Sequence, residues 1–324
     1  MACYHTTMII SASYKTDIPA FYGKWFMNRL RAGYCMIVNP YGKQVYRVNL
    51  EKSAVDGFVF WTKNLGPFQD CLVALHQQGY PFVVQYTING YSRVLESSVV
   101  DASRSAQHMK ALASKYGPEV AVWRYDTVVF SSLTPADFHR RNFEVLAKSL
   151  AGTTNEVVLS FAQFYKKTVR NMNAAAEQYG FSWYDPGDEE KRLLLADLAE
   201  IAKGYKMRPA ICGQRQFLIE GVSDARCIDA IRLSRVAGRL VSAQHKAQRP
   251  GCGCFAAKDI GEYDTCLHGC VYCYAVGNHD LARGRFRQHD PAGEFLFLPD
   301  RDDLVERASD LRKRTTQDGL FEDM

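Results

Sequence analysis

The chain has 324 residues, of which 47% are apolar and 23% are charged. This balance is typical of a globular protein and excludes the disordered and fibrous classes. The net charge of +5 suits an anionic partner such as nucleic acid, but solubility alone explains it as well. The longest apolar runs, such as 57–61, are too short to span a bilayer, and no secretory signal pattern is seen at the start. We therefore expect a cytoplasmic protein that does not contact a membrane.

Short β-branched and aromatic runs alternate with segments of helical periodicity along most of the chain. The strands that we predict are 8–13, 35–39, 57–62, 81–88, 120–126, 156–163 and 207–212. The helices that we predict are 20–32, 101–116, 135–151, 168–179 and 188–203. Such alternation indicates βαβ units and a parallel sheet. Because no GxGxxG motif follows the first strand, we expect an α/β fold of the TIM type, a full or partial β/α barrel, rather than a dinucleotide-binding sheet.

The composition changes after residue 245, where glycine, cysteine and charged residues replace periodic structure. We predict a β/α barrel domain over 1–245 and a C-terminal region over 246–324 that packs on the barrel. This second region begins with a cysteine-rich loop and ends in a charged tail that includes Arg283, Arg285 and Arg287. A terminal helix is expected over 302–314.

Polar residues stand at the ends of several predicted strands, where a barrel of this type has its active-site mouth. Lys63, Gln85, Arg124 and Asp126 are the main candidates for contacts with a cofactor or substrate. Arg124 and Asp126 share one face of a strand, because side chains alternate with a period of two. An arginine suits a carboxylate or phosphate, and an aspartate suits an amino group or ribose hydroxyls. The alternative is that the two residues pair with each other and only close the barrel.

The ten cysteines are unevenly placed, and seven of them crowd into residues 212–273. In a reducing compartment such crowding favours metal ligation over disulfides. Cys266, Cys270 and Cys273 have the spacing Cys-x3-Cys-x2-Cys. Three thiolates can hold three irons of a 4Fe–4S cluster and leave the fourth iron open for a small molecule, such as the amino and carboxylate groups of S-adenosylmethionine. Gly269 would let this loop turn tightly, and Tyr272 could pack against the cluster or an adenine.

Two other readings of this loop are weaker. His268 could complete a Cys3His zinc site, but it lies within the x3 segment, where common ligation is awkward. A redox-active CxxC pair at Cys270 and Cys273 would leave Cys266 unexplained.

Cys212, Cys227, Cys252 and Cys254 form a second set, large enough for another iron–sulfur cluster or a structural zinc ion. The alternative to metal ligation is that Cys212 and Cys227 are buried apolar residues. The sequence does not decide between these readings.

The loop sequence DTCLHGCVYCYA resembles the cluster loop of the radical S-adenosylmethionine superfamily, and its YCYA ending resembles the spore photoproduct lyase branch. Over residues 8–275 the chain resembles the bacterial family called domain of unknown function 1848. The matching segments are SASYKTDIPAFY, VFWTKN, WRYD, SFAQFYKKT and GCGCFAAKDIGEYDTCLHGCVYCYA.

This resemblance implies a radical S-adenosylmethionine enzyme with a 4Fe–4S cluster, which would need a reductant such as flavodoxin or ferredoxin. The chain departs from the superfamily because its cluster loop lies near the C-terminus instead of after the first strand. It departs from the family pattern at Tyr14 and Lys15, where arginines are expected, and at Leu65 and Thr127, where proline is expected.

We therefore expect an enzyme that reductively cleaves S-adenosylmethionine and acts on an unidentified substrate, with nucleic acid as one candidate. The alternative is a non-catalytic zinc or iron–sulfur module that recognises nucleic acid or a protein partner.

Overall fold

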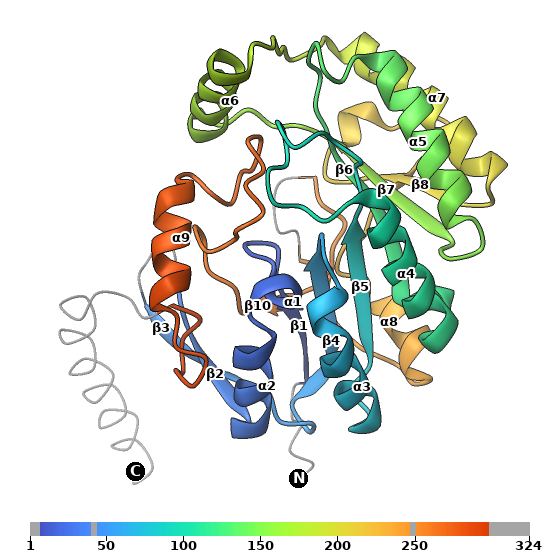
Figure 1. The fold of residues 1–324 in the computed structure, drawn as a ribbon. Helices are drawn as coiled ribbons and strands as arrows, with labels where there is room; N and C mark the ends of the chain where they lie inside the picture. Colours follow the sequence, from blue (N-terminus) through green and yellow to red (C-terminus); the bar gives the residue numbers. More distant parts are fainter. Residues whose placement is uncertain (1–6, 40–43, 247–250, 298–324) are drawn as a thin grey trace, which may run out of the picture.

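The computed structural model describes residues 7–39, 44–246 and 251–297. Its centre is a wholly parallel sheet of eight strands in the order β10-β1-β4-β5-β6-β7-β8-β9 (Figure 1). The strands are β1 (Met8–Ala12), β4 (Val55–Thr62), β5 (Phe82–Thr87), β6 (Ala121–Val128), β7 (Glu156–Phe161), β8 (Arg208–Ile211), β9 (Ser223–Asp224) and β10 (Ala257–Asp259). The predicted α/β class is thus confirmed. Within the described residues the sheet is open, because β10 and β9 do not pair with each other.

One predicted strand lies outside this sheet. The segment 35–39 corresponds to β2 (Tyr34–Val38), which forms an antiparallel hairpin with β3 (Val45–Asn49). The other predicted strands correspond to β1, β4, β5, β6, β7 and β8.

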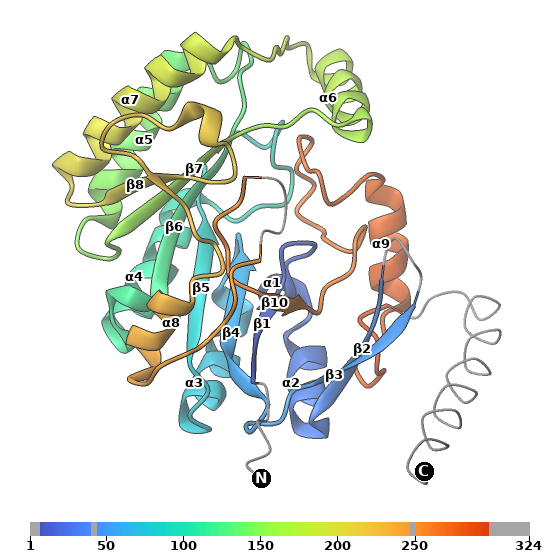
Figure 2. The same ribbon diagram turned by 180° about the vertical axis from the view of Figure 1, so that it is seen from behind.

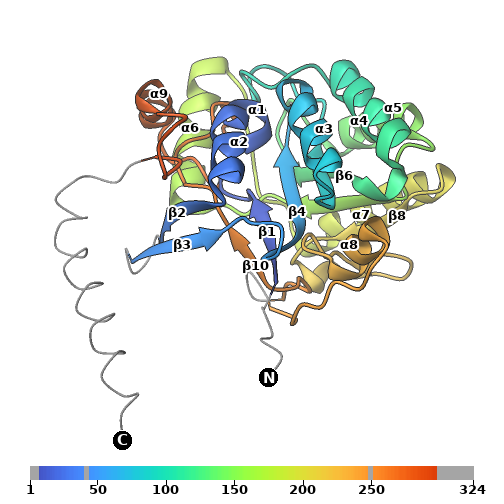
Figure 3. The ribbon, with the colours of Figure 1, turned by 90° about the horizontal axis from the view of Figure 1, so that it is seen from below.

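The helices flank the sheet on both faces. They are α1 (Ile18–Phe21), α2 (Gly23–Ala32), α3 (Gln69–Gln77), α4 (Ala102–Tyr116), α5 (Ala136–Leu150), α6 (Lys166–Tyr179), α7 (Asp188–Gly204), α8 (Ala230–Ala237) and α9 (His279–Gln288), with single 3-10 turns at Gly66–Phe68, Pro118–Val120 and Arg215–Phe217. Helices α3, α4, α5 and α7 lie along one face, and α8 lies against the other (Figures 2 and 3). Helices α3, α8 and α9 were not predicted, and the expected helix over 302–314 lies outside the described residues.

The two faces of the sheet carry different apolar cores because neighbouring side chains alternate between them. Ile10, Phe58 and Trp123 belong to the larger core under the outer helices. The core on the α8 side, which we call the inner face, includes Val59 and Leu233 and is smaller. At Gly57 of β4 a Cβ atom would stand 2.9 Å from the Leu233 side chain, so glycine permits the close approach of α8.

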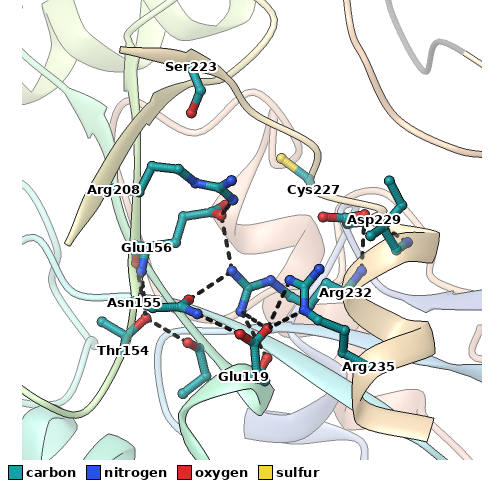
Figure 4. A network of polar contacts seen from close by, with 12 residues as sticks. Glu119, Thr154, Asn155, Glu156, Arg208, Ser223, Cys227, Asp229, Arg232 and Arg235 are labelled. Atoms are coloured by element: carbon teal, nitrogen blue, oxygen red, sulfur yellow. Dashed lines mark hydrogen bonds and ion pairs between the residues drawn. The ribbon is translucent and has the colours of Figure 1, made fainter. Parts of the chain in front are cut away.

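Buried ion pairs fix α8 across the amino-terminal ends of the strands (Figure 4). The Arg232 side chain is only 2% exposed and lies 3.0 Å from the carboxylate of Glu156 and 3.4 Å from that of Glu119. Arg208 also pairs with Glu156. Buried charges of both signs compensate each other here, and losing one partner would leave the other without compensation.

The segment after residue 245 contributes to the same sheet. β10 pairs with β1 in parallel, with Ile9 opposite Ala257 and Ser11 opposite Asp259. Helix α9 contains the arginines that were predicted to lie in a charged tail. The domain boundary at 245 remains a prediction. None of the helices in the described ranges is long and apolar enough to cross a membrane.

We expect the substitution Arg232→Met to lower the free energy of unfolding by about 3 kcal/mol, because it leaves the buried carboxylate of Glu156 with only the exposed Arg208 as an ionic partner in the described part of the chain. Arg235→Met is the matched control on the same helix. Arg235 is half exposed and pairs with Glu119 alone, so its loss should cost less than about 1 kcal/mol. Urea unfolding followed by circular dichroism measures both. Equal losses for the two variants would contradict the role given to Arg232.

Candidate functional site

The inner face changes from apolar to polar along each strand. Nearer the amino ends of the strands, this face carries apolar residues such as Val83 and Val122. Two residues further on, toward the carboxyl ends of the strands, the same face carries mostly polar side chains: Ser11, Trp61, Gln85, Arg124, Ser160 and Cys212. The carboxyl ends of parallel strands meet at one edge of the sheet, which is where ligands bind in α/β proteins.

Arg124 is the centre of the polar contacts on β6. Its Nε donates to Asp126 over 2.9 Å, and its Nη1 donates to Gln85 Oε1 over 3.1 Å and to the Cys227 sulfur over 2.9 Å. Burial alone would lower the pKa of Arg124, but Asp126 and the nearby thiols hold it well above its ordinary value. The guanidinium therefore stays charged. The pairing of Arg124 with Asp126, which was the alternative to ligand contacts, is observed, together with two partners that were not predicted.

Lys63 and Tyr272 lie in an adjoining group of polar residues. The carboxylate of Glu96 accepts hydrogen bonds from Lys63 Nζ over 2.8 Å, from Asn89 over 3.2 Å and from the Tyr272 hydroxyl. Asn89 also accepts a hydrogen bond from the Asp126 amide over 3.0 Å. The five residues predicted to contact a cofactor or substrate thus belong to one continuous hydrogen-bond network.

The loop that carries Cys266, Cys270 and Cys273 is closed at its base and fixed at its tip. At the base, the amide of Asp264 donates to the carbonyl of Ala275 over 3.0 Å. At the tip, the amide of Ser98 donates to the carbonyl of His268 over 3.0 Å. Gly269 has a φ of 66°, and a Cβ atom there would collide with the Ser97 side chain. The expected need for glycine at this turn is confirmed.

The three thiols of this loop are free of disulfides, and each is buried or half-buried. Amide hydrogens point at their sulfurs: the amide of Ala275 donates to Cys273 over 3.3 Å, and that of His268 donates to Cys266. Burial raises the pKa of all three thiols, and repulsion between their ionised forms adds to the rise for Cys266 and Cys270. An iron–sulfur cluster would supply the positive charge that these thiolates lack, and amide donors to sulfur are typical of such sites. Buried thiols with amide donors suit such ligation, and the cluster itself stays a prediction for this loop.

His268 is engaged elsewhere. Its Nε2 hydrogen-bonds to Asp17 Oδ2 over 2.6 Å, and the same oxygen accepts from the amide of Lys63 over 2.7 Å. Nδ1 of His268 is buried and has no hydrogen-bond partner in the described part of the chain. Asp17 thus joins the cysteine loop to the ends of β1 and β4.

Some residues of the site were not among the sequence-based candidates. Glu96 lies in the loop after β5 and no motif or strand end marks it, whereas Asn89 directly follows the predicted strand 81–88. Lys15 lies 3.7 Å from the carboxylate of Asp259. Asp259 also accepts hydrogen bonds from the hydroxyls of Ser11 and Ser13.

The second set of cysteines also comes together on the inner face. Cys212, Cys227 and Cys254 are buried in the smaller core, and Cys252 packs against it. Across the described ranges, no group of three or more His, Cys, Asp or Glu side chains stands as it would around a single metal ion. Zinc and second-cluster ligation of these residues stay predictions.

Comparison with known proteins places the chain in a family. The model of the family named domain of unknown function (DUF1848) matches residues 9–275, which is most of the chain. The protein belongs to this family, as its sequence motifs suggested. No curated protein and no solved structure matches the chain.

We expect Glu96→Gln to lower the free energy of unfolding by about 3 kcal/mol, because the buried ammonium of Lys63 loses its compensating charge. Burial opposes that charge in the native protein, and Glu96 outweighs it and raises the pKa of Lys63. In the variant nothing at position 96 outweighs the burial of Lys63, so the pKa of Lys63 becomes lower in the folded protein than in the unfolded chain. The unfolded chain of the variant then binds more protons than the folded protein. The difference in free energy of unfolding between the variant and the wild type should therefore shrink as the pH rises toward about 10.

Asp101→Asn is the control for this prediction. Asp101 forms an exposed pair with Arg93, so its loss should cost less than about 1 kcal/mol at any pH. Urea unfolding of the metal-free proteins at several pH values measures both effects. A deficit for Glu96→Gln that does not change with pH would contradict the charge argument.

Proposed function

We propose that this protein is a radical S-adenosylmethionine enzyme whose 4Fe–4S cluster is held by Cys266, Cys270 and Cys273. The observation that carries the proposal is the position of these three unpaired thiols beside a network of buried charged groups. Lys63 connects the two parts, since its Nζ hydrogen-bonds to Glu96 over 2.8 Å and to the hydroxyl of Tyr272 in the cysteine loop over 3.2 Å. Three ligands rather than four leave one iron free for a small molecule.

A cluster held by Cys266, Cys270 and Cys273 would supply the electron for reductive cleavage of S-adenosylmethionine. The protein's own residues bind and orient the reactants. Lys63 and Arg124 keep positive charge at the site and suit the carboxylate of the methionyl group. Asp126 and Glu96 suit its amino group and the ribose hydroxyls. Because these side chains pair with one another in the structure, a ligand must replace part of those contacts.

The open parallel sheet agrees with the partial form of the β/α barrel. In such a fold the reactive centre lies at the carboxyl edge of the strands. The cysteine loop reaches this edge from the C-terminal part of the chain, where it contacts loops that follow β1, β4 and β5. The strand order alone does not require the loop to follow the first strand, so the superfamily's chemistry is compatible with this arrangement.

The proposal extends to the substrate, the electron donor and the cellular location of the protein. The basic balance of the chain and the arginines of α9 favour an anionic substrate such as nucleic acid. The electron would come from a flavodoxin or ferredoxin. The abundance of free cysteines favours a reducing compartment such as the cytoplasm.

Cys266→Ala tests the proposal. After anaerobic reconstitution we expect the wild-type protein to show iron–sulfur absorption and an electron paramagnetic resonance signal on reduction. With dithionite and S-adenosylmethionine it should form 5′-deoxyadenosine. The variant should form no more 5′-deoxyadenosine than a sample without protein.

Cys71→Ala is the matched control, because Cys71 is half-buried in α3 and belongs to neither cysteine set. It should keep the wild-type iron content and product yield. The proposal fails if the wild-type protein forms no 5′-deoxyadenosine, or if Cys266→Ala forms as much as Cys71→Ala. Zinc without iron in anaerobically purified protein would instead indicate a non-catalytic metal-binding module.

A further inference from the structure

Four cysteines outside the loop at 264–277 converge from three separate parts of the chain. Cys212 follows β8, Cys227 precedes α8, and Cys252 and Cys254 precede β10. The sulfurs of Cys212 and Cys227 are 3.2 Å apart. The thiol of Cys254 hydrogen-bonds to those of Cys227 and Cys252. The four thiols therefore form a continuous row, and none of them is in a disulfide.

We propose that Cys212, Cys227, Cys252 and Cys254 form a second metal centre, with four thiolate ligands to zinc or to an iron–sulfur cluster. This centre is separate from the proposed cluster on Cys266, Cys270 and Cys273 and does not depend on the activity proposed above. Four cysteines are a complete ligand set for either kind of centre, so it would be structural or electron-carrying rather than open to substrate.

The surroundings of these sulfurs differ from those of ordinary buried cysteines. An apolar cysteine needs no charged neighbour, yet Arg124 Nη1 donates to the Cys227 sulfur over 2.9 Å. The amide of Ile228 donates to the Cys254 sulfur over 3.4 Å. Four thiolates around a divalent metal leave a net charge of about −2, and a buried guanidinium with amide donors stabilises such a charge.

Metal binding requires the four thiols to rearrange, because within the described residues no three of them stand as they would around a single metal ion. Two thiolates on one tetrahedral zinc ion stand about 3.8 Å apart, given Zn–S bonds of about 2.3 Å. Cys212 and Cys227 are closer than this because hydrogen-bonded thiols need no atom between them. A metal would replace these hydrogen bonds and separate the sulfurs by a fraction of an ångström.

The backbone that presents Cys227 is held firmly. Asp229 caps α8 by accepting hydrogen bonds from the amides of Ile231 and Arg232. The Arg232 side chain anchors the same helix to Glu156 and Glu119, and Cys227 lies close by, just before the helix (Figure 4). A fixed backbone reduces the entropy that a metal site loses when it forms.

Metal binding at this second centre would also affect the candidate active site. Arg124 contacts the Cys227 sulfur at one end and Asp126 at the other. A metal that fixes Cys227 would therefore fix Arg124 as well.

The test uses the full chain with Cys266, Cys270 and Cys273 all changed to alanine, so that only the second set can bind. Purified anaerobically, this triple variant should hold one zinc ion, or two or four irons with visible absorption, per chain. Adding Cys252→Ala and Cys254→Ala should remove that metal, whereas adding Cys71→Ala should not. The kind of metal found decides between zinc and an iron–sulfur cluster.

A second measurement needs no change in the second set and therefore does not depend on how the variant with Cys252→Ala and Cys254→Ala folds. Alkylation of the triple variant followed by mass spectrometry should show Cys252, the half-buried member of the set, protected with metal and reactive after a chelator is added. Cobalt(II) loaded in place of the native metal should give thiolate-to-metal absorption at one ion per chain.

The inference is overturned if the triple variant binds neither zinc, cobalt nor iron, or if the chelator leaves the alkylation pattern unchanged. A disulfide between Cys212 and Cys227 in the anaerobically purified protein would overturn it too. Failure of Cys266→Ala to affect 5′-deoxyadenosine formation would count against the proposed function alone.

Discussion

The alternation of side chains along parallel strands is the constraint on which the rest of this structure depends. Every strand of the sheet runs in the same direction, so residues of matching position lie in rows across it. On the inner face the row nearer the amino ends of the strands is apolar, and the row nearer their carboxyl ends is mostly polar. A shift of one residue in any strand would move these side chains to the opposite face. Val122, Val83 and Ala210 stand two positions earlier on the same strands and pack in the inner core. Their packing brings Arg124, Gln85 and Cys212 to the same edge of the sheet.

Much of the sheet could be predicted from sequence because its central strands are long and rich in β-branched and aromatic residues. β9 and β10 have two and three residues, too few for a periodic pattern. The strand at 35–39 was visible, but a lone strand gives no sign of its partner, and it pairs in a hairpin. Helices α8 and α9 had a usable signal, since Asp229 and Asn278 cap them with side-chain hydrogen bonds.

The candidate site was predictable in its chemical groups but not in its pairings. Cys266, Cys270 and Cys273 stand out by spacing, and Arg124 and Asp126 by their place on one strand. Glu96 could not be found in this way, because a single acidic residue in a loop resembles many others. Its role arises only when the fold places it against Lys63 and Tyr272, which are far away in sequence. Long-range pairing of this kind leaves no local pattern.

The pairing of β10 with β1 has a consequence for the order of assembly. Asp259 accepts hydrogen bonds from Ser11 and Ser13, which precede it by 248 and 246 residues. Contacts of such separation form late, and during synthesis the N-terminal strands leave the ribosome long before their partner does. The cysteine loop follows β10 directly. Its thiols therefore reach their place only after most of the sheet exists, so metal insertion would be among the final steps in the maturation of the chain.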